Sequence, residues 1–213
     1  MGFAALHFTT KASPVWALVS RALYAMKSTS LFKYRALEPF RNLVDTLLKR
    51  RLYAAPYFDL NDPMEGRYIA AADGSIDKDI ERLIRGNKEK IRICSLSRKS
   101  VIDLMWAHYA NGSRGLVLEV GIPDHYDLRP VNYGGPAKVS VNMLNPTTAQ
   151  DVLSNKLAAW EYEEEERVFL EGSHFVDIEL RSIIVGTRMS SQDFSLLSSL
   201  AEKVCPDVPL RRA

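Results

Sequence analysis

Short apolar runs of strand length alternate irregularly with longer amphipathic segments along this chain, and this pattern limits the possible folds more than any single motif. The apolar runs predict strands over 31–34, 52–55, 91–96, 115–120, 131–133, 138–141, 167–170 and 175–180, with a further short one over 183–185. Apolar residues at helical spacing predict helices over 38–51, 77–90, 100–110, 147–160 and 191–204. Strands and helices that do not alternate regularly favour an α+β fold over a doubly wound parallel sheet. We therefore expect mixed or antiparallel sheets of short strands with flanking helices.

The chain is long enough for one domain. It has 213 residues, of which 46% are hydrophobic, so it can bury a core without metals or disulfides. We expect a single α+β domain over 31–205, preceded by an amphipathic helix over 13–27 and a linker that ends near residue 30. Ser13 and Pro14 suit the start of that helix. The basic residues Arg211 and Arg212 predict a flexible tail over 206–213.

Charge and cysteine content narrow the class of protein. The formal net charge of +2 is too small to argue for nucleic-acid binding by itself. Cys94 and Cys205 are too far apart in sequence for a zinc motif, and they predict reduced thiols in the cytoplasm. No apolar run approaches the roughly 20 residues that a membrane-spanning helix needs. We expect a cytoplasmic protein without a membrane span, and we predict no metal site.

An acidic run near position 165 carries the strongest chemical signal. If it begins a strand, Glu163, Glu165 and Arg167 share one face, because side chains alternate along a strand. Two carboxylates beside a guanidinium are suited to acid–base work or to stabilising a cationic transition state. The alternative is a solvated acidic edge strand with one ion pair.

A basic strand and a polar turn form the next candidates. Lys33 and Arg35 flank Tyr34, so two cations and a ring could hold a phosphate or carboxylate and stack on a base. A strand end with solvated basic side chains explains the same pattern. Asn61 and Asp62 lie in a turn after the second predicted strand, and the simplest interpretation is that they shape it.

His108 lies on a predicted helix, two residues after Trp106. A lone helical histidine is more often structural than catalytic, and no second histidine nearby supports a metal site. No Gly-x-Ser-x-Gly motif is present, and Cys94 lies in an apolar run, so a serine or cysteine nucleophile is weakly supported.

The order of these motifs resembles one bacterial family. The matching segments contain Lys33-Tyr34-Arg35, Asn61-Asp62-Pro63-Met64-Glu65, Trp106-Ala107-His108-Tyr109, Val131-Asn132-Tyr133 and Lys156 followed by Trp160-Glu161-Tyr162-Glu163. Together they are similar to the domain-of-unknown-function family numbered twenty-nine seventy-one, some members of which are associated with abortive-infection phage defence. The resemblance covers about residues 31–190, and Cys94-Ser95-Leu96 departs from the Cys-Phe-Ser of that family.

A second resemblance, at the level of the fold, is to ADP-ribosyltransferases. It implies NAD as the cofactor, held by Lys33 or Arg35 together with Asn61 and His108, with Tyr34 or Tyr53 stacked on the nicotinamide. It also implies catalysis by Glu165 or Glu163 with Arg167. A rival opening strand at His7-Phe8-Thr9 resembles the same enzymes but lies before the matched region.

Two functional hypotheses follow. The first is an NAD-consuming ADP-ribosyltransferase or NAD glycohydrolase, a toxin or phage-defence effector that modifies a protein or nucleic acid. The second is a non-catalytic module that binds a nucleotide or senses a phage component through the same polar cluster. A nuclease is a weaker third hypothesis, because the acidic run would repel phosphates.

Overall fold

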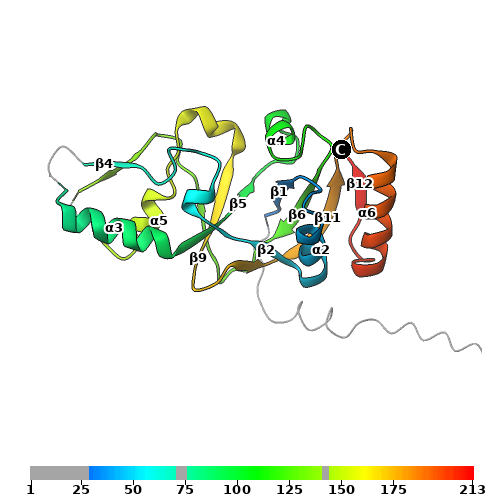
Figure 1. Cartoon of the computed structure of the whole chain (residues 1–213), viewed down its shortest axis with the longest axis horizontal. Helices are drawn as coiled ribbons and strands as arrows, with labels where there is room; N and C mark the ends of the chain where they lie inside the picture. Colours follow the sequence, from blue (N-terminus) through cyan, green and yellow to red (C-terminus); the bar gives the residue numbers. More distant parts are fainter. Residues whose placement is uncertain (1–28, 71–75, 141–143) are drawn as a thin grey trace, which may run out of the picture.

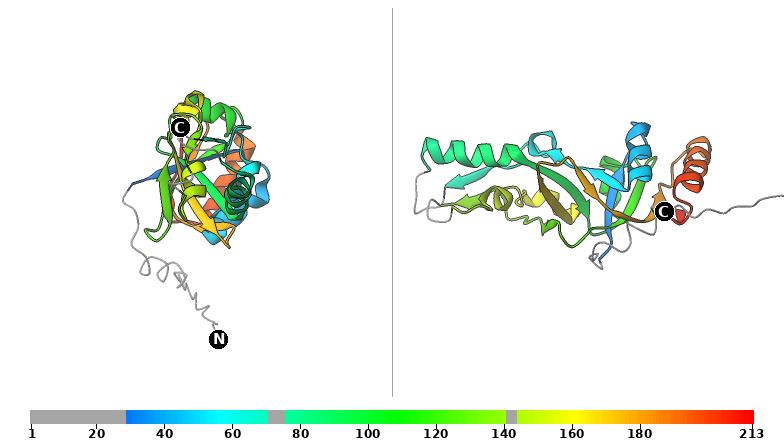
Figure 2. Two further views of the ribbon diagram at one scale, coloured as in Figure 1. Left: turned by 90° about the vertical axis from the view of Figure 1, so that its left-hand side faces the viewer. Right: turned by 90° about the horizontal axis from the view of Figure 1, so that it is seen from below.

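The computed structural model describes residues 29–70, 76–140 and 144–213. The predicted helix over 13–27 lies outside these ranges. The described part is an α+β domain, as predicted, with a mostly antiparallel sheet of short strands. The molecule is elongated, with helix α3 (Lys78–Lys90) at one end and helix α6 (Ser191–Val204) at the other (Figure 1). The view from below shows the same arrangement (Figure 2).

One large sheet organises the described part of the chain. Its strands follow the order β12-β11-β6-β1-β5-β9-β7, and β3 pairs with β5 beside this path. Every pairing in it is antiparallel except β11 with β12. The bounds are β1 Leu31–Arg35, β3 Ala55–Pro56, β5 Ile91–Ser97, β6 Leu116–Gly121, β7 Asp127–Pro130, β9 Glu165–Glu171, β11 Glu179–Val185 and β12 Leu210–Arg212.

Helices cover both faces of the sheet around β6. Leu116 and Leu118 of β6 belong to a core that also contains residues of α6 and of α2 (Phe40–Lys49). Val117 points to the opposite face, into a second core with Trp106 of α4 (Asp103–His108). This alternation follows from the two-residue period of a strand, and it explains why β6 is apolar at successive positions.

A smaller lobe extends away from α6. It contains α3, α5 (Thr148–Val152) and a parallel pair of strands, β4 (Tyr68–Ala70) and β8 (Ala137–Val139). Asp77 caps α3 by accepting hydrogen bonds from the backbone N–H groups of Asp79 and Ile80.

A separate two-stranded ribbon pairs β2 (Arg51–Tyr53) with β10 (Phe175–Asp177). A 3₁₀ turn, η1 (Tyr57–Asp59), follows β3.

Several predicted elements are confirmed within a few residues. They are the strands over 31–34, 91–96 and 115–120 and the helices over 38–51, 77–90 and 191–204. Each combines a clear apolar period with a length suited to its type, which is the condition under which local sequence predicts structure best.

Other predictions are wrong for tertiary reasons. The helix over 147–160 is divided into α5 and the 3₁₀ segment η3 (Ala158–Glu163), because Leu157 between them is extended. The helix predicted over 100–110 is present as α4, but its predicted cap at Ser100 is wrong: the helix starts at Asp103, and the Ser100 carbonyl accepts a hydrogen bond from the Trp106 indole. Residues 131–133 lie after β7 rather than forming a strand, although Asn132 makes an isolated bridge to Asn155.

The C-terminal half departs from prediction in two further places. The segment over 171–174 does not close a hairpin, because β9 pairs with β5 and β7 while β10 pairs with β2. The tail over 206–213, expected to be flexible, contains β12. Its residues Leu210–Arg212 pair with Ile183–Val185 of β11, so backbone hydrogen bonds hold it in place.

Candidate functional site

The site lies where the large sheet divides. β1 pairs with β6 along its whole length but meets β5 at the single register position Phe32–Ser97 of these described strands. Further along, β5 pairs with β3 instead, at Ile93 and Arg92. A cavity of about 820 Å³ opens beside this divergence. That volume falls within the range of small-molecule sites.

Lys33 of β1 bridges the divergence. Its Nζ donates a hydrogen bond of 2.9 Å to the Ser95 carbonyl of β5. This carbonyl therefore has a hydrogen-bond partner at a point where β1 and β5 have already separated. Lys33 and Arg35 both line the cavity, as do Tyr53 and Asn61. The structure therefore brings four residues predicted to bind a ligand to one cavity.

Five buried charged side chains form one end of the cavity, and we call them the charged cluster: Glu65, Lys156, Glu163, Glu165 and Arg167. The Arg167 guanidinium binds both Glu65 oxygens, at 2.6 and 2.8 Å, and its Nε donates to Glu165 at 2.8 Å. The Lys156 ammonium donates to Glu165 at 3.0 Å and to Glu163 at 2.5 Å. The charges therefore form a continuous chain of ion pairs, which offsets the cost of removing them from water.

Ion pairing within the cluster outweighs burial at Glu165 and at Lys156. Burial by itself would raise the pKa of Glu165, but the charges of Arg167 and Lys156 outweigh burial and lower this pKa to about 2. Burial would lower the pKa of Lys156, but Glu165 and Glu163 outweigh it and raise that pKa. Lys156 therefore remains an ammonium ion at neutral pH, which argues against its acting as an amine nucleophile.

Glu163 is held differently from Glu165. The Tyr109 hydroxyl donates a hydrogen bond of 2.5 Å to one Glu163 oxygen, and Lys156 donates to the other. Burial and the nearby Glu163 carboxylate raise the Tyr109 pKa, so the phenol stays protonated and remains a donor. Glu165 accepts three hydrogen bonds from two cations, whereas Glu163 accepts one on each oxygen. Glu163 consequently keeps more acceptor capacity for a ligand.

The predicted carboxylate face is confirmed in part. Glu165 and Arg167 lie on one face of β9, but Glu163 reaches them from η3, since Glu164 between them adopts a left-handed conformation with φ 43°. The alternative of a solvated edge strand is wrong, because β9 lies between β5 and β7 and these side chains are buried.

Two predicted ligand-binding residues have other contacts. Tyr34 belongs to the cavity wall, but its ring packs edge-on against Trp106 and its hydroxyl donates to the Lys99 carbonyl at 2.8 Å. The ring is thus unavailable for stacking on a ligand. His108 lies outside the cavity wall, and its Nδ1 is 3.1 Å from the Tyr162 hydroxyl.

The turn at Asn61-Asp62 shapes the site, as the sequence indicated. The buried Asp62 carboxylate accepts a hydrogen bond from the Met64 N–H, and its carbonyl accepts one from the Glu65 N–H. This turn directs Glu65 toward Arg167. The Asn61 amide donates to the Tyr109 hydroxyl over 3.4 Å, which links the turn to Glu163.

Sequence reasoning missed three site residues, Glu65, Lys156 and Tyr109. Each occurs in a motif that carried the family resemblance, yet nothing in the local pattern marked it as a partner of Arg167 or Glu163. Glu65 and Lys156 are charged residues in segments that contain both polar and apolar residues, and Tyr109 is an aromatic residue on a predicted helix. Such residues are too common in any sequence to be singled out as parts of a site.

The described fold and site define a class: an α+β protein whose open cavity ends on a buried cluster of carboxylates and cations. Comparison with protein-family models, with curated proteins and with solved structures gave no match. The two resemblances therefore remain predictions. In the described ranges, no helix is long and apolar enough to cross a membrane, and no group of three or more metal-ligating side chains is suitably placed.

Proposed function

We propose that this chain is an enzyme that cleaves the N-glycosidic bond of NAD, with Glu163 as the carboxylate at the reacting centre. The observation that carries the proposal is the position of Glu163, at the cavity end and held by Tyr109 and Lys156. Buried carboxylates in a cavity with a defined set of partners are frequent at functional sites.

The proposed chemistry uses the negative charge of Glu163. As the bond between ribose C1′ and the nicotinamide nitrogen breaks, the bonding electron pair moves to the nitrogen and neutralises the pyridinium. The ribose then gains oxocarbenium character, which a nearby carboxylate stabilises. A water molecule or a hydroxyl of a macromolecular target attacks C1′ and releases its proton to solvent. The first outcome is NAD hydrolysis, and the second is ADP-ribosyl transfer.

Cations that line the same cavity support an anionic substrate. Lys33, Arg35 and Arg41 line the same cavity as Glu163. Guanidinium and ammonium groups are the usual protein partners of phosphate oxygens. In this proposal they hold the pyrophosphate, while Glu165 and Arg167 position Glu163 through Lys156 rather than contacting the substrate. A role as a toxin or phage-defence effector rests on the family resemblance alone.

The test is nicotinamide release from NAD, measured by liquid chromatography and mass spectrometry. We expect Glu163→Gln to lower the rate by about 10²- to 10⁴-fold, because the amide keeps the shape of the side chain but carries no charge. The matched control is Glu161→Gln, an exposed glutamate in the same η3 segment, which should keep the wild-type rate. Unchanged turnover in folded Glu163→Gln protein would contradict the proposal.

A non-catalytic nucleotide-binding module is the second candidate. It is favoured by the internal contacts of Glu163, because Tyr109 and Lys156 already occupy one acceptor position on each of its oxygens. This candidate predicts that NAD raises the thermal unfolding midpoint while no nicotinamide is formed. The same mass-spectrometric measurement separates the two.

A further inference from the structure

The β2–β10 ribbon presents a group of neighbouring planar side chains beside the cavity. Tyr53 and Phe175 are directly opposed in the ribbon, and Arg51 lies on the same face as Tyr53, two residues earlier. The Arg51 guanidinium lies 3.6 Å from the centre of the Phe175 ring. The Tyr53 ring is edge-on to Phe175 and nearly parallel to His174, at interplanar angles of 70° and 7°. We call Arg51, Tyr53, His174 and Phe175 the aromatic shelf.

The shelf is ordered by contacts outside itself. Asp45 of α2 binds the Arg51 guanidinium through two hydrogen bonds, of 3.0 and 3.1 Å, and so fixes it above Phe175. A bidentate pair of this kind restricts a side chain more than a single contact does. The contact of Arg51 with Phe175, beside Tyr53, is therefore formed before any ligand arrives, which lowers the entropic cost of binding.

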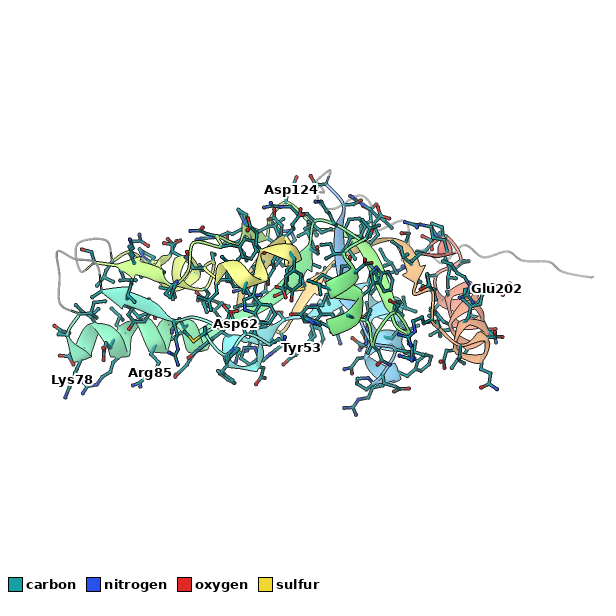
Figure 3. The ribbon with its side chains drawn as sticks, turned by 90° about the horizontal axis from the view of Figure 1, so that it is seen from above. Tyr53, Asp62, Lys78, Arg85, Asp124 and Glu202 are labelled. Carbon is teal, nitrogen blue, oxygen red and sulfur yellow. The ribbon has the colours of Figure 1, made fainter. Side chains whose placement is uncertain are left out.

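The shelf is accessible, and three of its four residues line the cavity. Tyr53 is 55% exposed, although it is a large aromatic side chain, and it lines the cavity together with Arg51 and Phe175. Figure 3 places Tyr53 and Asp62 near the middle of the long molecule, between Lys78 at one end and Glu202 at the other. An accessible ring on the wall of a polar cavity is a surface on which a planar ligand group can stack.

The charges near the shelf indicate what kind of planar group fits. The wall built from β1, α2 and β2 contributes Lys33, Arg35, Arg41 and Arg51 to the cavity. Asp45 of α2 and Glu38, which lies between β1 and α2, also line the cavity, and Asp45 is already paired with Arg51. A planar, aromatic group attached to an anion matches this combination of rings and cations, and a nucleobase carrying a phosphate is such a group.

We propose that the aromatic shelf is a nucleobase-binding subsite for a free nucleotide, with the base stacked on Tyr53 and the phosphate near Lys33 and Arg41. The subsite rests on the proposed function in one respect. If the protein cleaves NAD, a single dinucleotide would place its base on the shelf and its scissile bond at Glu163. Base binding itself needs no catalysis, so it can be measured separately.

The experiment is calorimetric titration of the full chain with AMP and with ribose 5-phosphate, which lacks the base. We expect Tyr53→Leu to weaken AMP binding by about 10-fold or more, while Tyr53→Phe keeps wild-type affinity. Ribose 5-phosphate should bind both wild type and Tyr53→Leu equally weakly. The matched control is Phe58→Leu, because Phe58 is 64% exposed but does not line the cavity.

Two results would overturn the subsite: equal AMP affinity in wild type and folded Tyr53→Leu, or equal affinity of wild type for AMP and ribose 5-phosphate. Repeating the titration in Glu163→Gln separates this proposal from the catalytic one. AMP binding that depends on Tyr53, in a protein that releases no nicotinamide, would support the shelf and contradict the proposed catalysis.

Discussion

Arg167 is the residue on which the charged cluster depends. All five of its N–H donors are used: Nε binds Glu165, one terminal nitrogen binds Glu65 and the Leu153 carbonyl, and the other binds Glu65 and Glu165. A planar guanidinium supplies this fork of donors, and a lysine ammonium does not. The side chain is 1% exposed, so water cannot replace a lost partner.

Removing this guanidinium should therefore cost much of the folding free energy. We expect Arg167→Met to lower the free energy of unfolding by about 3–5 kcal/mol, because the buried Glu65 then loses its bidentate partner and Glu165 keeps only its contact with Lys156. Urea denaturation measures the change. Arg98→Met is the control. Arg98 pairs at the surface with Glu166, which lies on β9 next to Arg167, and this pair should contribute less than about 1 kcal/mol. Equal effects of the two substitutions would show that the cluster does not stabilise the fold.

Glu165 makes stability depend on pH in the acid range. Its pKa is about 2 in the folded protein, against an ordinary value of 4.5. A carboxyl with a lowered folded-state pKa stabilises the protein above the ordinary value, and this contribution is lost as pH falls toward the folded value. We expect the free energy of unfolding to decrease from pH 4.5 to pH 2, and to decrease less steeply in Glu165→Gln. Parallel pH profiles of the two proteins would disprove this assignment.

At the scale of elements, the connection between α4 and β6 positions one side of the cavity. Asn111, Gly112 and Ser113 all have positive φ, at 50°, 61° and 64°, so the chain turns sharply after Tyr109 has reached Glu163. Gly115 then passes against the end of β1. A Cβ atom at Gly115 would lie 2.3 Å from the Arg35 carbonyl oxygen, closer than any real contact.

We therefore expect replacement by alanine to have opposite effects on stability at two glycines, Gly115 and Gly86. Gly115→Ala should destabilise the protein by about 3 kcal/mol or more, because the β1 and β6 backbones must separate to admit the methyl group. Gly86→Ala should stabilise it by about 0.5–1 kcal/mol, because Gly86 is inside α3 and nothing lies within 4 Å of the added carbon. Thermal unfolding of both variants tests the pair. A stabilising Gly115→Ala would contradict the packing described for β1 and β6.

At the scale of the whole molecule, β12 protects one edge of the large sheet. It pairs in parallel with β11, and the Ala213 N–H donates to the Val185 carbonyl. Without β12, the backbone groups of Ile183–Val185 would form an open edge, and open edges promote self-association. The C-terminal strand thus stabilises the same sheet that, three strands further along at β1, lines the cavity.

Deletion of residues 210–213 tests this role. We expect the loss of three ladder pairs and of the half-buried Leu210 to cost about 2 kcal/mol, which corresponds to a decrease of about 4–8 °C in the unfolding midpoint. Size-exclusion chromatography should show increased self-association. The double substitution of Arg211 and Arg212 by Lys keeps the strand and serves as the control. A deletion variant with wild-type stability and no self-association would show that β12 is dispensable.

The sequence by itself determined the fold class, most elements and part of the site. Strands such as β5 and β6 and helices such as α6 carry their own apolar period, so local pattern is sufficient to predict them. The alternation of Glu165 and Arg167 also placed them correctly on one face of a strand, since the two-residue period is a property of the backbone.

Only the tertiary structure decided which residues meet. Glu65, Lys156 and Arg167 come from a turn, a loop and a strand, and the turn at Asp62 directs Glu65 to Arg167. Likewise, the Tyr34 ring packs against Trp106 because α4 covers that face of the sheet, and β12 is ordered because β11 offers it a free edge. Contacts between distant positions have no local period, because they arise from the balance of burial, ion pairing and backbone pairing in the whole fold.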